Sequence, residues 1–209
     1  MRGEAGKAPL DRNTLYRLGR ALAKTLGSDR PARLCIGRDT RESCGWIEAA
    51  LARGVREGGG EAVSAGVIPT PGLALVTREQ GFDAGLMVSA SHNPFHDNGV
   101  KVFSREGAKL SDELEAAIER DMNVEPAPDG DADEPLQPQA GLHHHYLAFL
   151  ERCLEGTRLD GLKVVLDAAH GAAFEIGPEA FRAAGAEIEV IGDQPDGRNI
   201  NEGCGSLYP

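Results

Sequence analysis

The sequence is poor in cysteine and has no long apolar run. Its 209 residues include 4 cysteines, which are widely spaced and form no C-x-x-C pair. This excludes the dense disulfide framework of a small secreted domain, so we expect a reduced, cytoplasmic protein. No apolar run approaches the roughly 20 residues that a membrane-spanning helix needs, and the start Met1-Arg2-Gly3-Glu4 does not resemble a signal peptide. We therefore predict a soluble protein that is not exported.

Positive charge is also scarce. Lys and Arg number 22 against 33 Asp and Glu, a formal net charge of −11. Nucleic acids and anionic membranes are polyanionic and bind basic faces, so this balance argues against both as partners. The scarcity is uneven, because residues 1–120 carry 17 basic and 16 acidic groups whereas residues 121–209 carry 5 and 17. The first half can therefore still present local positive charge.

Helical and strand patterns alternate along the chain, and a hydrophobic content of 41% is enough for a core. Apolar spacing and capping residues predict helices over residues 11–26, 47–55, 69–77, 111–121, 142–154 and 177–184. Short apolar runs predict strands over residues 34–36, 61–65, 84–88, 100–103, 162–166 and 186–191, with 84–88 and 162–166 buried. The alternation is typical of the α/β class, with a parallel or mixed sheet and helices on both faces.

A change of composition divides the chain. Residues 122–140 contain four prolines and five acidic residues but no Lys or Arg, which is typical of an extended, solvated connector. We therefore predict a first domain over 1–121, a linker over 122–140 and a second domain over 141–209. The second domain has only two predicted strands, whereas a mean sheet has about 5–6. We expect it to be incomplete.

The stretch richest in candidate catalytic residues is V-S-A-S-H-N-P-F-H-D-N-G-V-K at residues 88–101. It follows a predicted strand, at the end where open α/β sheets bind ligands, and successive amides in such a turn can hold an anion. Ser91 offers a hydroxyl nucleophile beside the imidazole of His92, and Lys101 offers an ammonium group nearby. The residues suit phosphoryl chemistry. An ordinary Ser/Asn turn before a proline is an equally good interpretation of the residues alone.

The run S-A-S-H-N-P-x-x-D-N-G-x-K at residues 89–101 resembles the phosphoserine loop of the α-D-phosphohexomutases, in particular their bacterial phosphoglucosamine mutase branch. Five more stretches agree with the family in order and spacing: Arg2-Gly3 with the end of F-G-T-D-G-I-R-G, residues 37–41 with G-[KR]-D-T-R, residues 69–71 with P-T-P, residues 165–172 with the D-x-x-x-G-A strand end, and residues 195–206 with P-D-G-x-N-I-N-x-G-C-G-S. The resemblance extends from residue 2 to residue 209. Ser89 and the last segment are typical of phosphoglucosamine mutases rather than of phosphomannomutases.

The resemblance implies an isomerase that interconverts glucosamine 6-phosphate and glucosamine 1-phosphate through a phosphoserine enzyme and a sugar bisphosphate. It implies roles for six residues: Ser91 as phosphoserine, Lys101 and His92 as acid/base groups, Arg2 and Arg41 in phosphate binding, and Asn98 in shaping the loop. A loose phosphoryl-transfer transition state needs positioning and positive charge, which these groups supply. The alternatives are a phosphomannomutase/phosphoglucomutase, or a non-catalytic phosphate-binding domain.

The sequence also departs from the family pattern. The family holds one Mg²⁺ per active site between a phosphoserine oxygen, here on Ser91, and three aspartates of a D-G-D-G-D-R loop, which suits a hard ion. That loop is absent, and we interpret the alternating carboxylates of 129–133 as linker. The family's third and fourth domains and the start of its N-terminal segment are missing too. We therefore expect this chain to be an N-terminal fragment that is inactive by itself. The resemblance implies that the whole protein is a cytoplasmic enzyme that binds a hexosamine phosphate and supplies amino-sugar nucleotide and peptidoglycan synthesis. Whether the whole protein forms a homodimer is left open.

Three other features invite chemical interpretations. His143, His144 and His145 point about 100° apart on a helix and cannot converge on one ion, so we expect a solvated helix start. Arg38 and Arg41 flank Asp39, and either serve the site or hold the loop by ion pairs. We expect the buried-strand residue Cys35 to be a core residue rather than a reactive thiol.

Overall fold

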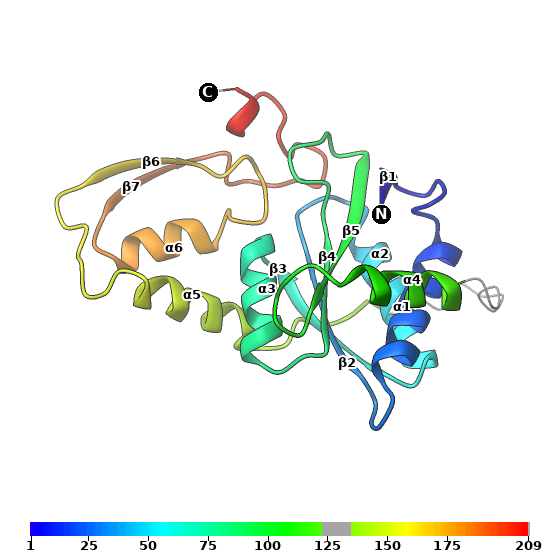
Figure 1. The fold of residues 1–209 in the computed structure, drawn as a ribbon. Helices are drawn as coiled ribbons and strands as arrows, with labels where there is room; N and C mark the ends of the chain where they lie inside the picture. The colour runs from blue at the N-terminus through cyan, green and yellow to red at the C-terminus, as the bar shows by residue number, and fades with distance from the viewer. Residues whose placement is uncertain (123–134, 209) are drawn as a thin grey trace.

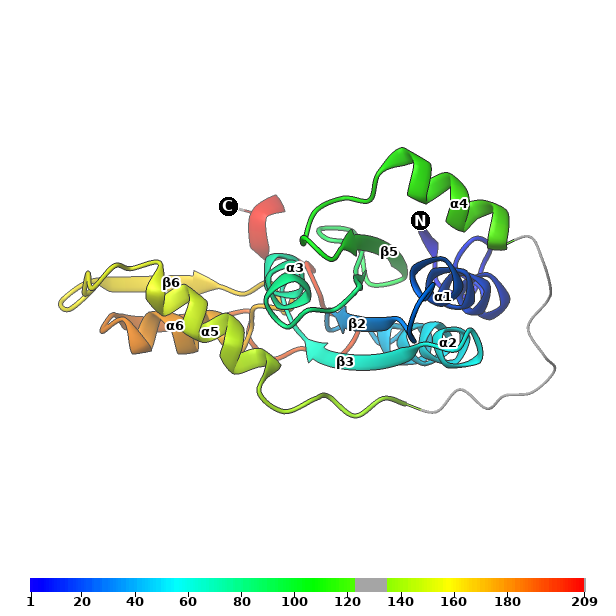
Figure 2. The ribbon, with the colours of Figure 1, turned by 60° about the horizontal axis from the view of Figure 1, so that its bottom comes forward.

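The computed structural model describes residues 1–122 and 135–208 and contains two sheets (Figure 1). We refer to residues 1–122 as the N-terminal region and to residues 135–208 as the C-terminal region. Most of the predicted linker, including the carboxylates of 129–133, lies outside the described residues. Residues 142–191 of the C-terminal region lie to the left of the N-terminal region in Figures 1 and 2.

The first sheet is mixed and has the order β1-β5-β4-β2-β3. Its strands are β1 (Arg2–Glu4), β2 (Arg33–Arg38), β3 (Glu61–Val67), β4 (Ala84–Val88) and β5 (Asp97–Ser104). Strand β2 is parallel to β3 and β4, whereas β5 is antiparallel to both β4 and β1. The chain therefore reverses direction between β4 and β5, where the serine-containing stretch lies.

Helices cover both faces of this sheet. They are α1 (Arg12–Leu26), α2 (Cys44–Glu57), α3 (Thr70–Glu79) and α4 (Asp112–Met122). Side chains alternate between faces along each strand. Ile36 and Leu86 accordingly pack in one buried cluster with residues of α1, α2 and α4. Met87 packs on the opposite face with residues of α3, so the expected α/β architecture is confirmed.

Helices α1 and α2 cross closely because glycine stands at the crossing point. A Cβ on Gly54 would lie 2.0 Å from the carbonyl oxygen of Tyr16, and one on Gly19 would lie 2.2 Å from that of Leu51. Helix α1 begins after Asp11, its N-cap, which accepts a hydrogen bond from the Thr14 amide at 3.0 Å.

The second sheet has two parallel strands, β6 (Lys163–Asp167) and β7 (Glu187–Ile191). Helix α5 (Leu142–Arg152) precedes them, α6 (Ile176–Ala183) connects them, and a 3-10 turn η1 (Gly205–Leu207) follows. The expectation that 162–166 is a buried strand is wrong, since Val165 is 66% exposed. Helix α6 covers one face of the sheet, where a Cβ on Gly177 would lie 2.9 Å from Leu166 Cδ2, and no described element covers the face of Val165.

The two regions meet at α3 and α5 (Figure 2). Tyr146 of α5 packs over Gly72 of α3, where a Cβ would lie 2.6 Å from the tyrosine ring. Before α5, the chain passes along the outer edge of β3: Pro138 bridges to Ser64, and the Gln139 amide donates to the Ser64 carbonyl oxygen at 2.8 Å.

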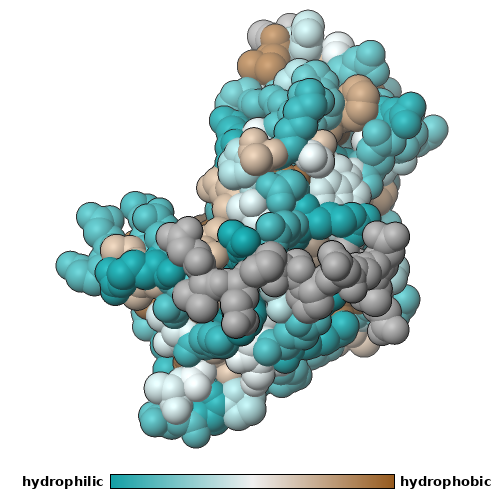
Figure 3. Space-filling view, turned by 90° about the vertical axis from the view of Figure 1, so that its right-hand side faces the viewer, coloured by the Kyte–Doolittle hydropathy of each residue, from teal (hydrophilic) through white to brown (hydrophobic). Residues whose placement is uncertain are grey.

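The predicted helices and strands are present in the predicted order, with ends that differ by a few residues. Strand β1 and the turn η1 are additions that the sequence patterns did not predict. No helix of residues 1–122 and 135–208 is long and apolar enough to cross a membrane. The face drawn in Figure 3 is mainly hydrophilic, with apolar residues in small groups.

Candidate functional site

The loop between β4 and β5, residues 89–96, carries the candidate nucleophile; we call it the serine loop. Ser91 is exposed and its φ is 57°, in the left-handed region. A non-glycine residue there costs about 1–3 kcal/mol and persists only where its surroundings impose it. Ser91 N donates to Ser89 Oγ at 3.0 Å, and Asn93 N donates to the Ala90 carbonyl oxygen at 3.2 Å. The loop is therefore a specific turn rather than an irregular connection.

Arg41 holds the serine loop from inside the protein. Its Nη2 donates to the carbonyl oxygens of Ser91 and Asn93, both at 2.9 Å, and its Nη1 donates to that of Pro94. Its Nε donates to Asp39 Oδ2 at 3.0 Å, in an ion pair whose side chains are 0% and 3% exposed. Of the two roles open for Arg41, the structure supports holding the loop. The guanidinium is buried among these partners, and its expected role in phosphate binding stays a prediction.

Arg38 makes a different ion pair. Its Nε lies 3.1 Å from Oε2 of Glu48, whose other carboxylate oxygen accepts from Ser64 Oγ at 2.5 Å. Burial raises the pKa of Glu48, and the Ser64 and Arg38 contacts oppose that shift. Arg38 therefore stabilises the sheet beside the loop rather than the loop itself.

A buried polar cluster supports Arg41 and the start of β5. Cys44 Sγ lies 3.1 Å from Asp39 Oδ1, and Asn98 Nδ2 donates to Ser43 Oγ at 2.9 Å. Asn98 is completely buried, and its Oδ1 accepts from the Gly99 amide at 2.8 Å. Burial, then the nearby Asp39 carboxylate, raise the pKa of Cys44, so this thiol stays protonated and can donate. Asn98 is thus fixed at the start of β5, directly after the serine loop, and its loop-shaping role stays a prediction.

Arg2 reaches the serine loop because β1 pairs with β5. Its Nη2 donates to the Ala90 carbonyl oxygen at 2.7 Å and to Asn93 Oδ1 at 3.0 Å. Asn93 Nδ2 in turn donates to Asp97 Oδ2 at 2.8 Å. The exposed guanidinium of Arg2 is therefore fixed beside the loop that presents Ser91, where it can meet an anion.

The two proposed acid/base residues differ in their relation to the loop. His92 is exposed and directly follows Ser91. Lys101 is exposed on β5, opposite Met87 of β4, and makes no hydrogen bond to the loop within residues 1–122 and 135–208. The structure thus brings Ser91, His92, Arg2, Arg41 and Asn98 together, and places Lys101 further along the strand.

The sequence did not single out Asn201, which also contacts the loop. Its Nδ2 donates to the carbonyl oxygens of Ser91 at 3.0 Å and Asn93 at 3.2 Å. Asn201 lies in the N-I-N-x-G-C-G-S segment, but only the three-dimensional structure shows its partner. The signal available in the sequence was that segment, without a role for any of its residues.

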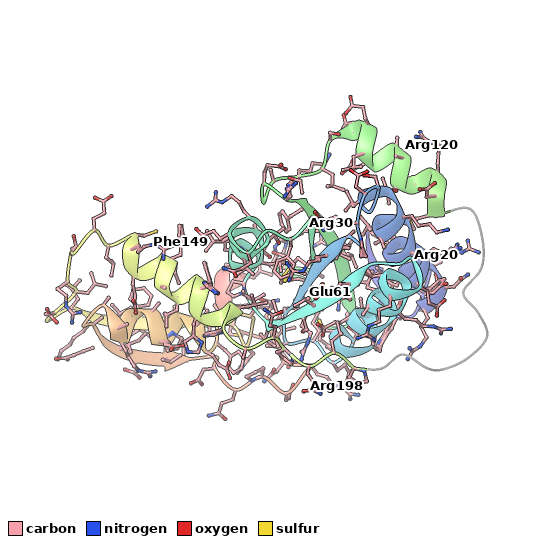
Figure 4. The ribbon with its side chains drawn as sticks, turned by 90° about the horizontal axis from the view of Figure 1, so that it is seen from below. Arg20, Arg30, Glu61, Arg120, Phe149 and Arg198 are labelled. Carbon is pink, nitrogen blue, oxygen red and sulfur yellow. The ribbon has the colours of Figure 1, made fainter. Side chains whose placement is uncertain are left out.

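Neighbouring contacts keep the segment around Asn201 against the N-terminal region. Arg198 Nε lies 2.6 Å from Glu42 Oε2, and the Glu42 amide donates to the Gly197 carbonyl oxygen at 2.9 Å. Thr40 Oγ1 donates to the His170 carbonyl oxygen at 2.5 Å. Figure 4 accordingly shows Arg198 beside the N-terminal region, away from Phe149 on α5.

The part of the chain that the structure describes contains no group of three His, Cys, Asp or Glu side chains arranged to hold a metal ion. His143 hydrogen-bonds to Glu179 at 3.0 Å, while His144 and His145 are exposed at the start of α5. Cys35 is completely buried, which raises the pKa of its thiol to about 12 and agrees with a core role. None of these residues belongs to the serine loop.

The fold and this site define a class: a mixed α/β domain whose loop after an inner strand presents an exposed serine beside an arginine. Residues 1–128 match the model of the phosphoglucomutase/phosphomannomutase family, alpha/beta/alpha domain I. Because the match covers more than half of the chain, the chain belongs to this family.

Curated relatives include the phosphoglucosamine mutases of Koribacter versatilis and Solibacter usitatus, at 44% and 43% identity. Each match covers 100% of this chain and 47% of the relative, so the chain spans about half the length of the curated relatives it matches. Among solved structures, a phosphoglucomutase/phosphomannomutase family protein from Burkholderia thailandensis has a TM-score of 0.73 at 27% identity, over 94% of this chain and 43% of that one. A putative phosphomannomutase from Thermus thermophilus has the same TM-score at 25% identity, over 95% and 45%.

Proposed function

We propose that this chain is the part of a phosphoglucosamine mutase that carries its phosphoserine, Ser91. The whole protein interconverts glucosamine 6-phosphate and glucosamine 1-phosphate. The observation that carries the proposal is the serine loop, which presents the Ser91 hydroxyl to solvent while Arg41 fixes its backbone and Arg2 lies beside it. The two curated relatives reported above bear this enzyme's name.

Each group has a defined role in this proposal. Phosphorylated Ser91 donates its phosphoryl group to one hydroxyl of the sugar phosphate, the bisphosphate reorients, and its other phosphate returns to Ser91 Oγ. Arg2 binds phosphoryl oxygens, and His92 and Lys101 exchange protons and balance negative charge. The transition state spreads negative charge over phosphoryl oxygens, so fixed donors lower its energy without reorganising during the reaction.

One Mg²⁺ per active site belongs to the proposal for the whole protein. When bound, such an ion neutralises phosphoryl charge. Within this chain, the ligand of the ion would be a phosphoryl oxygen on Ser91. The described residues supply no cluster of carboxylates that could complete the metal site. The residues present do not fit the ion by themselves, and its aspartate ligands would lie outside this chain.

The organisation of the whole protein is part of the same proposal. We place its first domain at 1–121, the linker at 122–140 and part of its second domain at 141–209. The protein acts on a small hexosamine phosphate in the cytoplasm and supplies amino-sugar nucleotide synthesis.

A phosphomannomutase or phosphoglucomutase is the second candidate, because the matching family and the Thermus structure carry those names. Assays of the full-length protein on glucosamine, glucose and mannose phosphates separate the two. We expect a clear preference for glucosamine phosphate. Equal turnover of the three sugars would favour the second candidate.

Mass spectrometry of the full-length protein tests the role of Ser91. We expect one phosphate on the peptide that contains Ser91, and loss of both this phosphate and mutase activity in Ser91→Ala. Ser206→Ala, which changes an exposed serine of the C-terminal region, should leave both unchanged. Phosphate on another residue, or activity that survives Ser91→Ala, would overturn the assignment.

The isolated 209-residue chain should not convert glucosamine 6-phosphate, since its sequence contains no D-G-D-G-D-R loop. Conversion by the purified chain would contradict this expectation.

A further inference from the structure

We propose that Asn201 is a positioning residue for Ser91: its amide group holds the serine loop from the C-terminal region, as Arg41 holds it from the N-terminal region. The functional meaning of this inference rests on the proposed phosphoserine role of Ser91. The contact joins two residues that are 110 positions apart in sequence, and it connects the two regions directly at the candidate nucleophile.

Both donors use the same two acceptors. The Ser91 carbonyl oxygen accepts from Arg41 Nη2 at 2.9 Å and from Asn201 Nδ2 at 3.0 Å. The Asn93 carbonyl oxygen accepts from the same two groups, at 2.9 Å and 3.2 Å. A carbonyl oxygen has two lone pairs, so these contacts satisfy the acceptor capacity of both oxygens. Rotation of the peptide unit after Ser91 would break bonds to both regions at once.

This arrangement accounts for the backbone conformation of Ser91. A serine with a φ of 57° is in an unfavourable region, and four hydrogen bonds to the carbonyl groups of residues 91 and 93 oppose its relaxation. The direction in which Ser91 presents its hydroxyl depends on that backbone conformation. Asn201 therefore acts on Ser91 through the loop, without touching the reacting oxygen.

Asn201 is itself held in place by the end of β6. The backbone amide of Asn201 donates to the Ala169 carbonyl oxygen at 3.0 Å, and the backbone amide of Ala169 donates to Asp167 Oδ1 at 2.8 Å. Asp167 Oδ2 accepts from the Gly205 amide at 2.6 Å, which closes the segment behind Asn201. A continuous set of hydrogen bonds thus connects the second sheet to the serine loop.

The backbone of Asn201 makes a clean test possible. Its φ is 62°, a conformation that glycine, asparagine and aspartate adopt more readily than other residues. Asn201→Gly keeps the backbone conformation and removes the side-chain amide. Asn201→Asp keeps size and backbone but replaces the N–H donor by a carboxylate that faces two carbonyl oxygens. If Asn201 served only as a turn residue, neither change would alter the serine loop.

The experiment is hydrogen–deuterium exchange of the 209-residue chain, read on the peptide that covers residues 89–98. We expect exchange of the protected loop amides to rise about tenfold in Asn201→Gly, the effect of losing about one hydrogen bond's net free energy, and further in Asn201→Asp. Arg198→Ala is the matched control, because it breaks the neighbouring ion pair to Glu42 without touching the loop. It should leave loop exchange within about twofold of the unmodified chain, the effect of a weak exposed ion pair.

Wild-type exchange in both Asn201 variants would overturn the inference. An equal rise in Arg198→Ala would overturn it too, since segment docking rather than the amide would then protect the loop. Peptides of β2 and β4 report whether a variant is folded, and Asn201→Gly tests the inference even if Asn201→Asp does not fold. The exchange comparison uses chains that all have unphosphorylated Ser91, so mutase activity that survives Ser91→Ala in the full-length protein would refute the proposed function while leaving this result intact.

Discussion

The two sheets of the chain differ in how their strands are covered. In the N-terminal region, helices pack on both faces, and Ile36 and Leu86 are completely buried. In the C-terminal region, Val165 and Ile191 are 66% and 48% exposed on β6 and β7. The serine loop extends from the sheet that helices cover on both faces, and the strands β4 and β5 of this sheet fix the two ends of the loop. Among the described residues of the C-terminal region, Asn201, which follows β7, donates side-chain hydrogen bonds to the loop.

The regions also differ in how they use charge. The N-terminal region buries both partners of the ion pair between Arg41 and Asp39. The ion pair of Arg158 with Asp160 in the C-terminal region is exposed. Removing one partner of a buried ion pair leaves the other charge buried and uncompensated, which is strongly destabilising. An exposed ion pair contributes little to stability. The same kind of substitution should therefore have very different effects in the two regions.

The largest effect is expected from Arg41→Met. It leaves the Asp39 carboxylate buried without its partner and should lower the free energy of unfolding by about 3–5 kcal/mol. Arg158→Met, the control, should change it by about 0–1 kcal/mol. Urea unfolding of both variants provides the measurement. Similar losses in the two variants would remove the contrast between the regions.

The second effect concerns packing. Leu86→Ala deletes a completely buried side chain from β4 and should cost about 2–5 kcal/mol, because a cavity remains. Val165→Ala trims an exposed side chain of β6 and should stay within about 0.5 kcal/mol. The midpoints of urea unfolding compare the two. A large loss at Val165 would show that the exposed face of β6 is covered in solution.

The smallest effect is a difference in the sign of pH dependence. Burial raises the pKa of Glu48 from 4.5, so the stability it contributes is present below that value and is lost as pH rises through the raised pKa. The amides of Arg198 and Asn199 lower the pKa of Asp196 from 3.8, so its contribution is present above that value and is lost as pH falls through the lowered pKa.

Urea unfolding against pH checks these signs, with Glu48→Gln and Asp196→Asn as references. Relative to Glu48→Gln, the unmodified chain should lose stability as pH rises above 4.5. Relative to Asp196→Asn, it should lose stability as pH falls below 3.8. Parallel curves for either pair would contradict the corresponding assignment.

Local sequence patterns predicted most of the fold, because helices and strands in this chain have clear apolar periodicity. They missed β1, whose residues Arg2–Glu4 have no such pattern and are ordered by pairing with β5. They also predicted burial for 162–166, where the structure exposes Val165. An apolar run predicts a strand but does not reveal what lies against each of its faces.

The residue patterns singled out the local part of the candidate site, whereas Arg2 and Arg41 were expected only from the family resemblance and without their contacts. Ser91, His92 and Asn98 lie within one continuous stretch, and the structure keeps them together around the loop. Arg41 and Asn201 act across separations of 50 and 110 residues, on backbone carbonyl groups that carry no sequence signal. Their contribution therefore depended on the tertiary structure.

The chain beside β3 has a consequence for self-association. Strand β3 is one of the two outer strands of the first sheet, and an exposed outer strand can pair with another molecule and start aggregation. Here the Gln139 amide already donates a hydrogen bond to the Ser64 carbonyl oxygen of β3. Pro138, which has no N–H, packs beside Gly66, where a Cβ would lie 3.2 Å from the proline ring. This stretch of the edge is closed to intermolecular strand addition, so concentrated solutions of the protein are protected there against sheet-mediated polymerisation.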